Sequence, residues 1–310
     1  MAAQATDLRD KVYAVLGLAD PEVYGITVDY RLPVLDVYTR AARALIAKSG
    51  RLEILGACAN PDRLHGLPSW VPNLIDGWKA EPFPFKVRKA HHEADVVFDD
   101  QKNSLRAKGI LHGFVGVICD VRVGPDDALE QLHRVYLAWK EFVANAERPE
   151  NTPGRHTEKD LAGGRNDSAW LDFLSAGSTS SYGMAYGRDG ALQTAKPETP
   201  YDHLRLSNHL DTRHAEALFV LGGGQPKLNP LFKIYCALGQ FGPGRSLGLL
   251  ENGAVALFPP GVRRGDAVAV LDGAAFPFVL RKHGESGDYT IVGEAREYPL
   301  DRRRYLKPSI

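Results

Sequence analysis

The sequence predicts an α+β protein in which helices pack around a small antiparallel sheet or barrel. Two patterns in the sequence predict this class. Apolar residues recur at the spacing of amphipathic helices in residues 7–49 and again in 125–146. The last third carries short β-branched runs separated by glycine and proline, which is typical of antiparallel strands joined by tight turns.

The length is sufficient for one large domain. With 310 residues, of which 44% are hydrophobic, the chain can bury a sizeable core. We expect a single domain, 1–310, built from a helical N-terminal lobe (1–92), a central hairpin plus helices (93–242) and a C-terminal β module (243–298).

The first helix is predicted over residues 7–17. Val12, Val15 and Leu16 recur at helical spacing between Asp7, a favoured capping residue, and Gly17, a favoured terminating residue. The pattern predicts a second helix over 34–49, before another glycine. Further helices are predicted at 125–146, 168–174, 203–221 and 229–241.

The strands are predicted from β-branched runs. A hairpin is expected from 96–98 and 105–110 around a polar turn, followed by a strand over 114–123. Four strands are expected near the end of the chain, at 255–257, 266–271, 278–281 and 289–292. The Gly/Ser-rich segment 175–183 is expected to form a linker or a mobile loop over a site.

Composition excludes several partners and compartments. The 38 basic side chains balance 38 acidic ones, so we expect no nucleic-acid partner. No apolar run approaches the length of a membrane helix and no signal sequence is evident, so we expect a cytoplasmic protein without membrane contact. The three cysteines stand far apart in apolar surroundings, which favours buried, reduced thiols.

Short motifs in two blocks of the chain give the strongest signal. The first block comprises Arg9-Asp10-Lys11-Val12-Tyr13-Ala14-Val15-Leu16-Gly17-Leu18, Asp29-Tyr30, Val37-Tyr38 and Leu67-Pro68-Ser69-Trp70-Val71-Pro72. The second comprises Gly265-Asp266, Val268, Val270-Leu271 and Gly273, then Pro277-Phe278-Val279-Leu280-Arg281, and finally Tyr289, Ile291-Val292-Gly293-Glu294. In order and spacing, these motifs resemble the fungal heterokaryon-incompatibility (HET) family, in the region that follows its signature N-terminal domain.

The resemblance implies a role in fungal self/non-self signalling. Because only eight residues precede Arg9, we expect the chain to correspond to the C-terminal region of such a protein, without the N-terminal domain. The end of the chain departs from the family pattern, since a basic run, Arg302-Arg303-Arg304, replaces the usual acidic end. We expect Arg9 and Asp10 to act structurally, through a carboxylate pair and the helix dipole respectively.

Two functions are considered. The first hypothesis is a cofactor-independent cyclase (a pericyclase of Diels-Alder type) acting on an apolar terpenoid-like intermediate of fungal secondary metabolism, by resemblance in family type and size to a norbornene-forming Diels-Alderase. Such a cyclase would work by positioning its substrate and donating one hydrogen bond to it. The alternative is a non-enzymatic interaction module of heterokaryon-incompatibility signalling, which predicts an exposed apolar patch for a partner.

The cyclase hypothesis requires an apolar pocket and a hydrogen-bond donor. We expect the pocket to be lined by aromatic residues of the proline-broken segment around residues 70–85 and closed by the Gly/Ser-rich loop. The candidate substrate-binding residues are Trp70, Trp78, Phe83 and Phe85, and the candidate catalytic donors are Tyr182, Tyr186, His91 and His92. For Trp70, a core anchor between two prolines is the alternative interpretation.

Neither a metal nor an organic cofactor is predicted. His203, His209 and His214 are spaced by six and five residues, which does not place them on one helical face as ligands. The glycine run at 222–224 lacks the lysine of a phosphate-binding loop, and no Gly-x-Ser-x-Gly elbow occurs.

Overall fold

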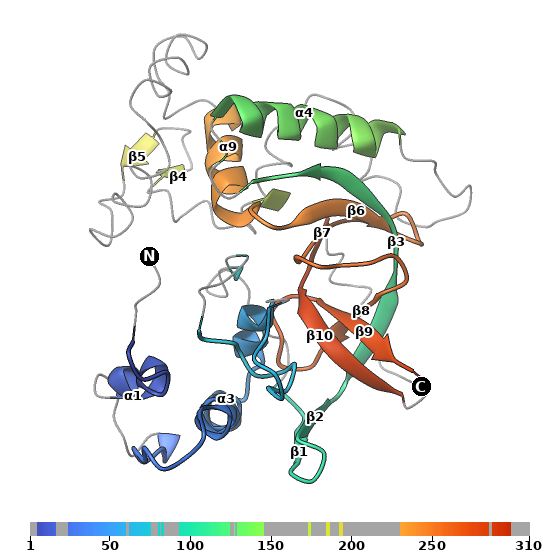
Figure 1. Ribbon diagram of the computed structural model, residues 1–310. Helices are drawn as coiled ribbons and strands as arrows, with labels where there is room; N and C mark the ends of the chain where they lie inside the picture. The colour runs from blue at the N-terminus through green and yellow to red at the C-terminus, as the bar shows by residue number, and fades with distance from the viewer. Residues whose placement is uncertain are drawn as a thin grey trace. The chain divides into compact units, whose positions relative to one another are not determined.

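The computed structural model describes residues 5–16, 24–59, 62–75, 80, 82–83, 93–124, 127, 129–145, 173–174, 184–186, 192–194, 230–284 and 287–298 (Figure 1). The chain divides into two compact units. Unit 1 comprises residues 1–116, 258–295 and 302–310, and unit 2 comprises 117–257 and 296–301. The expected division into three consecutive lobes stays a prediction.

The helices agree well with the predicted ranges. They are α1 (Asp10–Leu16), α3 (Val34–Ser49), the 3-10 helix η1 (Glu53–Cys58), α4 (Leu129–Asn145) and α9 (Pro230–Phe241). Helix α3 has the predicted bounds, and it ends because Gly50 adopts the left-handed conformation (φ 63°) while its N–H bonds the Ile46 carbonyl. Of the helices predicted at 168–174 and 203–221, only 173–174 is helical within the described residues; the rest lies outside them.

The main sheet is larger than predicted. Its seven strands run in the order β10-β9-β8-β3-β6-β7-β11. Their bounds are β3 (Gly109–Arg122), β6 (Ser246–Leu250), β7 (Val255–Phe258), β8 (Ala267–Leu271), β9 (Phe278–His283), β10 (Asp288–Glu294) and β11 (Arg296–Tyr298). The mixed α+β class is therefore confirmed. The prediction of a small sheet or barrel is corrected, because the sheet has seven strands. Among the described residues, β10 and β11 do not pair with each other, so the sheet is not closed into a barrel.

The long strand β3 explains this difference. Its first half pairs antiparallel with β8, from Gly109↔Leu271 to Phe114↔Ala267. The sequence pattern predicts that this segment is a strand, but it does not predict which other strand pairs with it. From the pattern alone, the segment is expected to follow the hairpin rather than to join the C-terminal sheet.

Two smaller strand pairs complete the β structure. The predicted hairpin is confirmed as β1 (Val96–Asp99) and β2 (Ser104–Ala107), with Val96 opposite Ala107. The short strands β4 (Met184–Tyr186) and β5 (Leu192–Thr194) pair antiparallel. Among the described residues, no helix is both long and apolar enough to cross a membrane.

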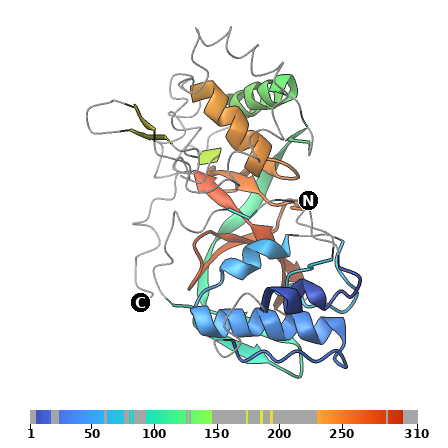
Figure 2. The same ribbon diagram turned by 90° about the vertical axis from the view of Figure 1, so that its left-hand side faces the viewer.

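The core of unit 1 lies between its helices and its strands. Helices α1 and α3 lie side by side (Figure 2), and they pack with η1, the turn around Trp70 and strand β9. The fully or almost fully buried apolar side chains of this core are Val12, Tyr13, Val37, Tyr38, Ala42, Ile46, Leu52, Leu55, Cys58, Trp70, Val71 and Phe278.

Unit 2 has its own core under α4. Helix α4 lies alongside α9 and the second half of β3 (Figure 1). Trp139 of α4 is completely buried and its indole N–H donates to the Val121 carbonyl at 2.8 Å. Of the apolar residues that recur at helical spacing along this helix, Leu132, Val135, Tyr136, Trp139 and Val143 are buried.

Candidate functional site

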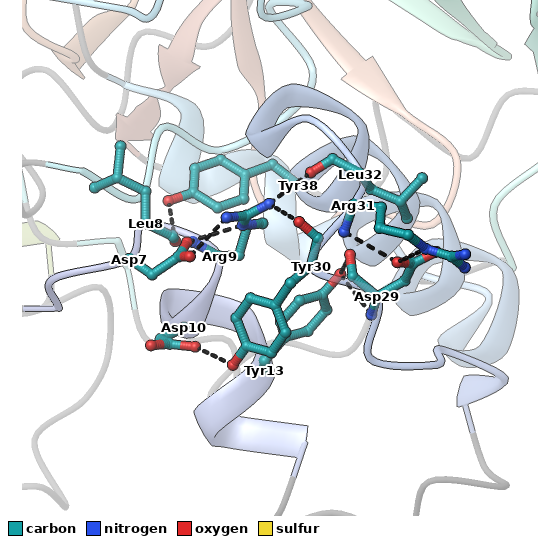
Figure 3. A network of polar contacts seen from close by, with 10 residues as sticks. All are labelled: Asp7, Leu8, Arg9, Asp10, Tyr13, Asp29, Tyr30, Arg31, Leu32 and Tyr38. Carbon is teal, nitrogen blue, oxygen red and sulfur yellow. Dashed lines mark hydrogen bonds and ion pairs between the residues drawn. The ribbon is translucent and has the colours of Figure 1, made fainter.

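The N-terminal motifs form a polar network inside unit 1 (Figure 3). The Arg9 guanidinium binds both carboxylate oxygens of Asp7, at 2.9 and 2.7 Å, and also donates to the carbonyls of Tyr30 and Leu32. The Tyr38 hydroxyl of α3 donates to the Leu8 carbonyl at 2.8 Å. These bonds connect the start of α1 to the segment before α3 and to α3 itself.

Two tyrosines extend the network. The Tyr13 hydroxyl donates to the Asp29 carbonyl at 3.0 Å, and the Tyr30 hydroxyl donates to the Asp10 carboxylate at 2.6 Å (Figure 3). Arg31 hydrogen-bonds the Asp29 carboxylate and thereby lowers the pKa of Asp29 to about 2. The structural role expected for Arg9 is supported, because its guanidinium is occupied by one carboxylate and two backbone carbonyls.

The proline-flanked Trp70 turn is a second structural motif. Trp70 is 4% exposed, its indole N–H donates to the Asn103 carbonyl at 3.1 Å, and its ring contacts Phe98. The Arg63 guanidinium donates to the carbonyls of Pro68 and Val71 and so holds the turn from its other end. Burial lowers the pKa of Arg63.

The C-terminal motifs are also held by buried carboxylates. Asp266, 5% exposed, accepts two hydrogen bonds from the Arg281 guanidinium, at 2.9 and 2.7 Å. Glu294, 4% exposed, accepts the backbone N–H of Phe83. A side chain at Gly293 (φ 153°) would lie 2.6 Å from Pro259, so the strand approaches its neighbour too closely for any other residue.

Two of the eight predicted site residues are described with their side chains. Trp70 occupies the core as set out above, in agreement with the core-anchor interpretation. Phe83 is 2% exposed and packs on Phe276, with ring centroids 5.2 Å apart. Their role as substrate-binding residues stays a prediction.

The other six predicted site residues remain untested. Tyr186 lies in β4, but its side chain is outside the description. The residues outside the described part of the chain are Trp78, Phe85, His91, His92 and Tyr182. The aromatic pocket and its donor therefore stay predictions.

Unit 2 contains an apolar groove that sequence reasoning missed. It has a cavity volume of about 740 Å³ and lies where α4, β3 and β6 meet. Its lining residues are Val117, Val121, Ala138, Glu141, Phe142, Asn145 and Leu249. In the sequence, the groove could be anticipated only from Glu141 and Asn145, which stand one helical turn apart beside Phe142. The strand residues that line the groove come from tertiary packing, which no local pattern predicts.

A histidine–tyrosine pair lies between α4 and α9. The His133 Nδ1 atom and the Tyr235 hydroxyl are 2.6 Å apart, and the Tyr235 ring stands edge-on to Tyr136. The two members are separated by 102 positions in the sequence. No local pattern predicts such a pair.

Reactive thiols and metal ligands are not evident in the described residues. Cys58 and Cys119 are buried and free, as expected, and burial raises the pKa of the Cys58 thiol to about 12. In the same part of the chain, no group of histidine, cysteine and acidic side chains has the arrangement of a metal site. His203, His209 and His214 lie outside it.

Comparison with known proteins identifies the class to which these motifs point. Residues 231–298 match the Het-6 β-barrel domain, a stretch that includes α9 and the strands from β6 to β11. The predicted resemblance to heterokaryon-incompatibility proteins is thereby confirmed. No solved structure matches the chain.

One curated relative extends the similarity along almost the whole chain. Heterokaryon incompatibility protein 6, OR allele, of Neurospora crassa is 28% identical over 334 aligned positions, which cover 94% of this chain and 48% of the relative. The chain thus spans about half the length of the curated relative it matches. Neither finding concerns a Diels-Alderase.

Proposed function

We propose that this chain is a non-enzymatic recognition module of heterokaryon-incompatibility signalling. The observation that carries the proposal is the similarity to the incompatibility protein of Neurospora crassa over 94% of the chain. The structural use of the sequence motifs supports it. Arg9, Asp266 and Glu294 bind other groups of the chain, as scaffold residues do.

Exposed apolar side chains in one stretch of unit 1 support contact with a protein partner. Ile110, Leu111 and Phe114, all in the first half of β3, are 43%, 54% and 40% exposed. Ile110 and Leu111 are consecutive and point to opposite faces of the sheet, so the stretch offers apolar side chains to a partner on both faces. We assign partner recognition to this stretch of β3.

A growth assay tests this function. The chain is expressed in Neurospora crassa strains that carry or lack the OR allele of the relative, and hyphal growth and cell death are scored. We expect growth arrest in one genetic background only. Phe114→Asp should abolish the arrest, whereas Val97→Asp, at a residue 56% exposed elsewhere in unit 1, should retain it. Identical growth in every background would contradict the proposal.

The cyclase hypothesis stays a prediction and has a separate test. Purified protein is incubated with apolar terpenoid-like polyenes in the presence of EDTA, and products are resolved by mass spectrometry. Cyclised product formed faster than in the protein-free control would favour an enzyme over the recognition module. Absence of cyclised product from both samples would agree with the recognition module.

A further inference from the structure

The groove of unit 2 has the dimensions of a small-molecule site. Its volume of about 740 Å³ lies within the range of roughly 300–1,000 Å³ that holds small ligands. The helical side, from Ala138 to Asn145, extends over about 10 Å at the helical rise. The strand side, from Val117 to Val121, extends over about 13 Å.

Most of the groove is apolar. Val117 and Val121 are 53% and 39% exposed although they belong to a central strand of the sheet, and Leu249 of the neighbouring strand β6 is 8% exposed. Phe142 of α4 contributes an aromatic ring to the wall. Covering the two exposed valines with an apolar chain would remove their surface from water, which is favourable by the hydrophobic effect.

The polar groups of the groove lie on one ridge. Glu141 and Asn145 are both exposed, stand four residues apart on α4, and are therefore neighbours on the helix surface. A carboxylate accepts hydrogen bonds and attracts a cation, and the neighbouring amide adds a further acceptor. None of the lining residues that the structure describes is basic, so none of them neutralises Glu141.

We propose that this groove binds a small amphipathic molecule with an apolar body of medium length and a cationic or hydrogen-bond-donating head. The body lies against Val117, Val121 and Leu249, and the head lies at Glu141 and Asn145. The proposal goes beyond the recognition function and uses none of the β3 residues assigned to partner recognition. An anionic amphiphile of equal length is disfavoured because its head would face a carboxylate.

The charge preference is tested with two probes that share an alkyl tail. Decyltrimethylammonium and decanoate, each below its micelle concentration, are titrated into the full chain by isothermal calorimetry. We expect the cation to bind more tightly than the anion. Glu141→Gln should weaken cation binding by about threefold to fivefold, the range for an exposed charge pair, without weakening decanoate binding.

The location is tested with a matched pair of arginine substitutions. Val117→Arg places a charged side chain on the apolar wall and should weaken binding of the cation by about tenfold or more. Leu137→Arg is the control, because Leu137 is 50% exposed on α4 but does not line the groove, and it changes the net charge equally. It should bind the cation as the wild type does. Circular dichroism checks that both variants are folded. If Val117→Arg does not fold, Glu141→Gln, at an exposed residue, still tests the site.

Three results would overturn the proposal. The first is equal affinity of the wild type for both probes, or no binding of either. The second is unchanged cation binding by folded Val117→Arg and by Glu141→Gln. The third is a wild-type dimer in sedimentation that Val117→Arg converts to a monomer, which would assign the groove to a second copy of the chain.

Discussion

Replacing Trp70 tests whether the proline-flanked turn of unit 1 is scaffold. The side chain is 4% exposed, its indole N–H bonds the Asn103 carbonyl at 3.1 Å, and its ring lies 5.6 Å from Phe98. Trp70→Ala removes the apolar contacts and the hydrogen bond together. Trp70→Phe retains most of the apolar contacts and removes the hydrogen bond.

The magnitudes follow from these contacts. Large-to-small replacement of a buried aromatic residue costs about 3–5 kcal/mol, so we expect Trp70→Ala to lower the free energy of unfolding by that amount. Trp70→Phe removes the hydrogen bond to the Asn103 carbonyl, which costs about 0.5–1.5 kcal/mol because water can reach the exposed Asn103. Leu137→Ala, at an exposed residue, should change the free energy by less than about 0.5 kcal/mol.

Urea unfolding followed by circular dichroism measures these differences. The chain has two compact units, so the midpoint and slope of each transition are fitted separately. We expect the two Trp70 variants to shift the same transition, Trp70→Ala further than Trp70→Phe. An unchanged midpoint for Trp70→Ala would refute the scaffold assignment, and loss of ligand binding at unchanged stability would indicate a binding residue instead.

Three further predictions concern carboxylates and a thiol of unit 1. Gly56→Ala should destabilise the fold by about 1–3 kcal/mol in urea, because its Cβ would lie 2.6 Å from a carboxylate oxygen of buried Glu294; an unchanged midpoint would show that this carboxylate can move. Arg31 depresses the pKa of Asp29 from 3.8 to about 2, so the stability that this ion pair confers is present above pH 4 and lost on acidification to pH 2. In thermal melts, the Tm difference between the wild type and Asp29→Asn should therefore shrink between pH 4 and pH 2. A Tm difference that stays constant over this range would show that the ion pair does not stabilise the fold. Cys58, with its pKa raised to about 12 by burial, should resist iodoacetamide at pH 8 until urea unfolds the chain, as measured by peptide mass mapping, and rapid labelling of the native protein would contradict its burial.

Local patterns were sufficient for most of the secondary structure. Helix α3 follows its predicted range because a strong apolar period ends at a glycine that can adopt φ 63°. Helix α4 begins four residues later than predicted, and before it the Asp127 carboxylate accepts the Gly124 N–H at 2.7 Å. Strands β4, β5, β6 and β11 were not predicted. For β6 the reason is that every residue is buried, so the run shows no polar–apolar alternation.

The candidate site was less predictable than the fold. Aromatic residues near a proline-rich turn predict a pocket, which stays untested; of these residues, Trp70 and Phe83 are buried in contacts with Phe98 and Phe276. Composition and proximity in sequence do not distinguish a cleft from a core, because both are lined by the same side chains. The groove of unit 2 was missed because a strand assignment does not give exposure. Val117 was assigned correctly to a strand, but whether its side chain is exposed depends on which segments cover that strand.

The sequence by itself determined the class of this protein, its helices, most of its strands and its resemblance to heterokaryon-incompatibility proteins. These depend on local period, on capping residues and on short motifs such as the one around Arg9, whose carboxylate partner Asp7 is two positions away. Only the tertiary structure decided the partners of β3, the bond between Glu294 and Phe83 across 211 positions, and the groove. The physical reason is that long-range pairing and solvent exposure depend on how distant segments pack, and no local pattern records that packing.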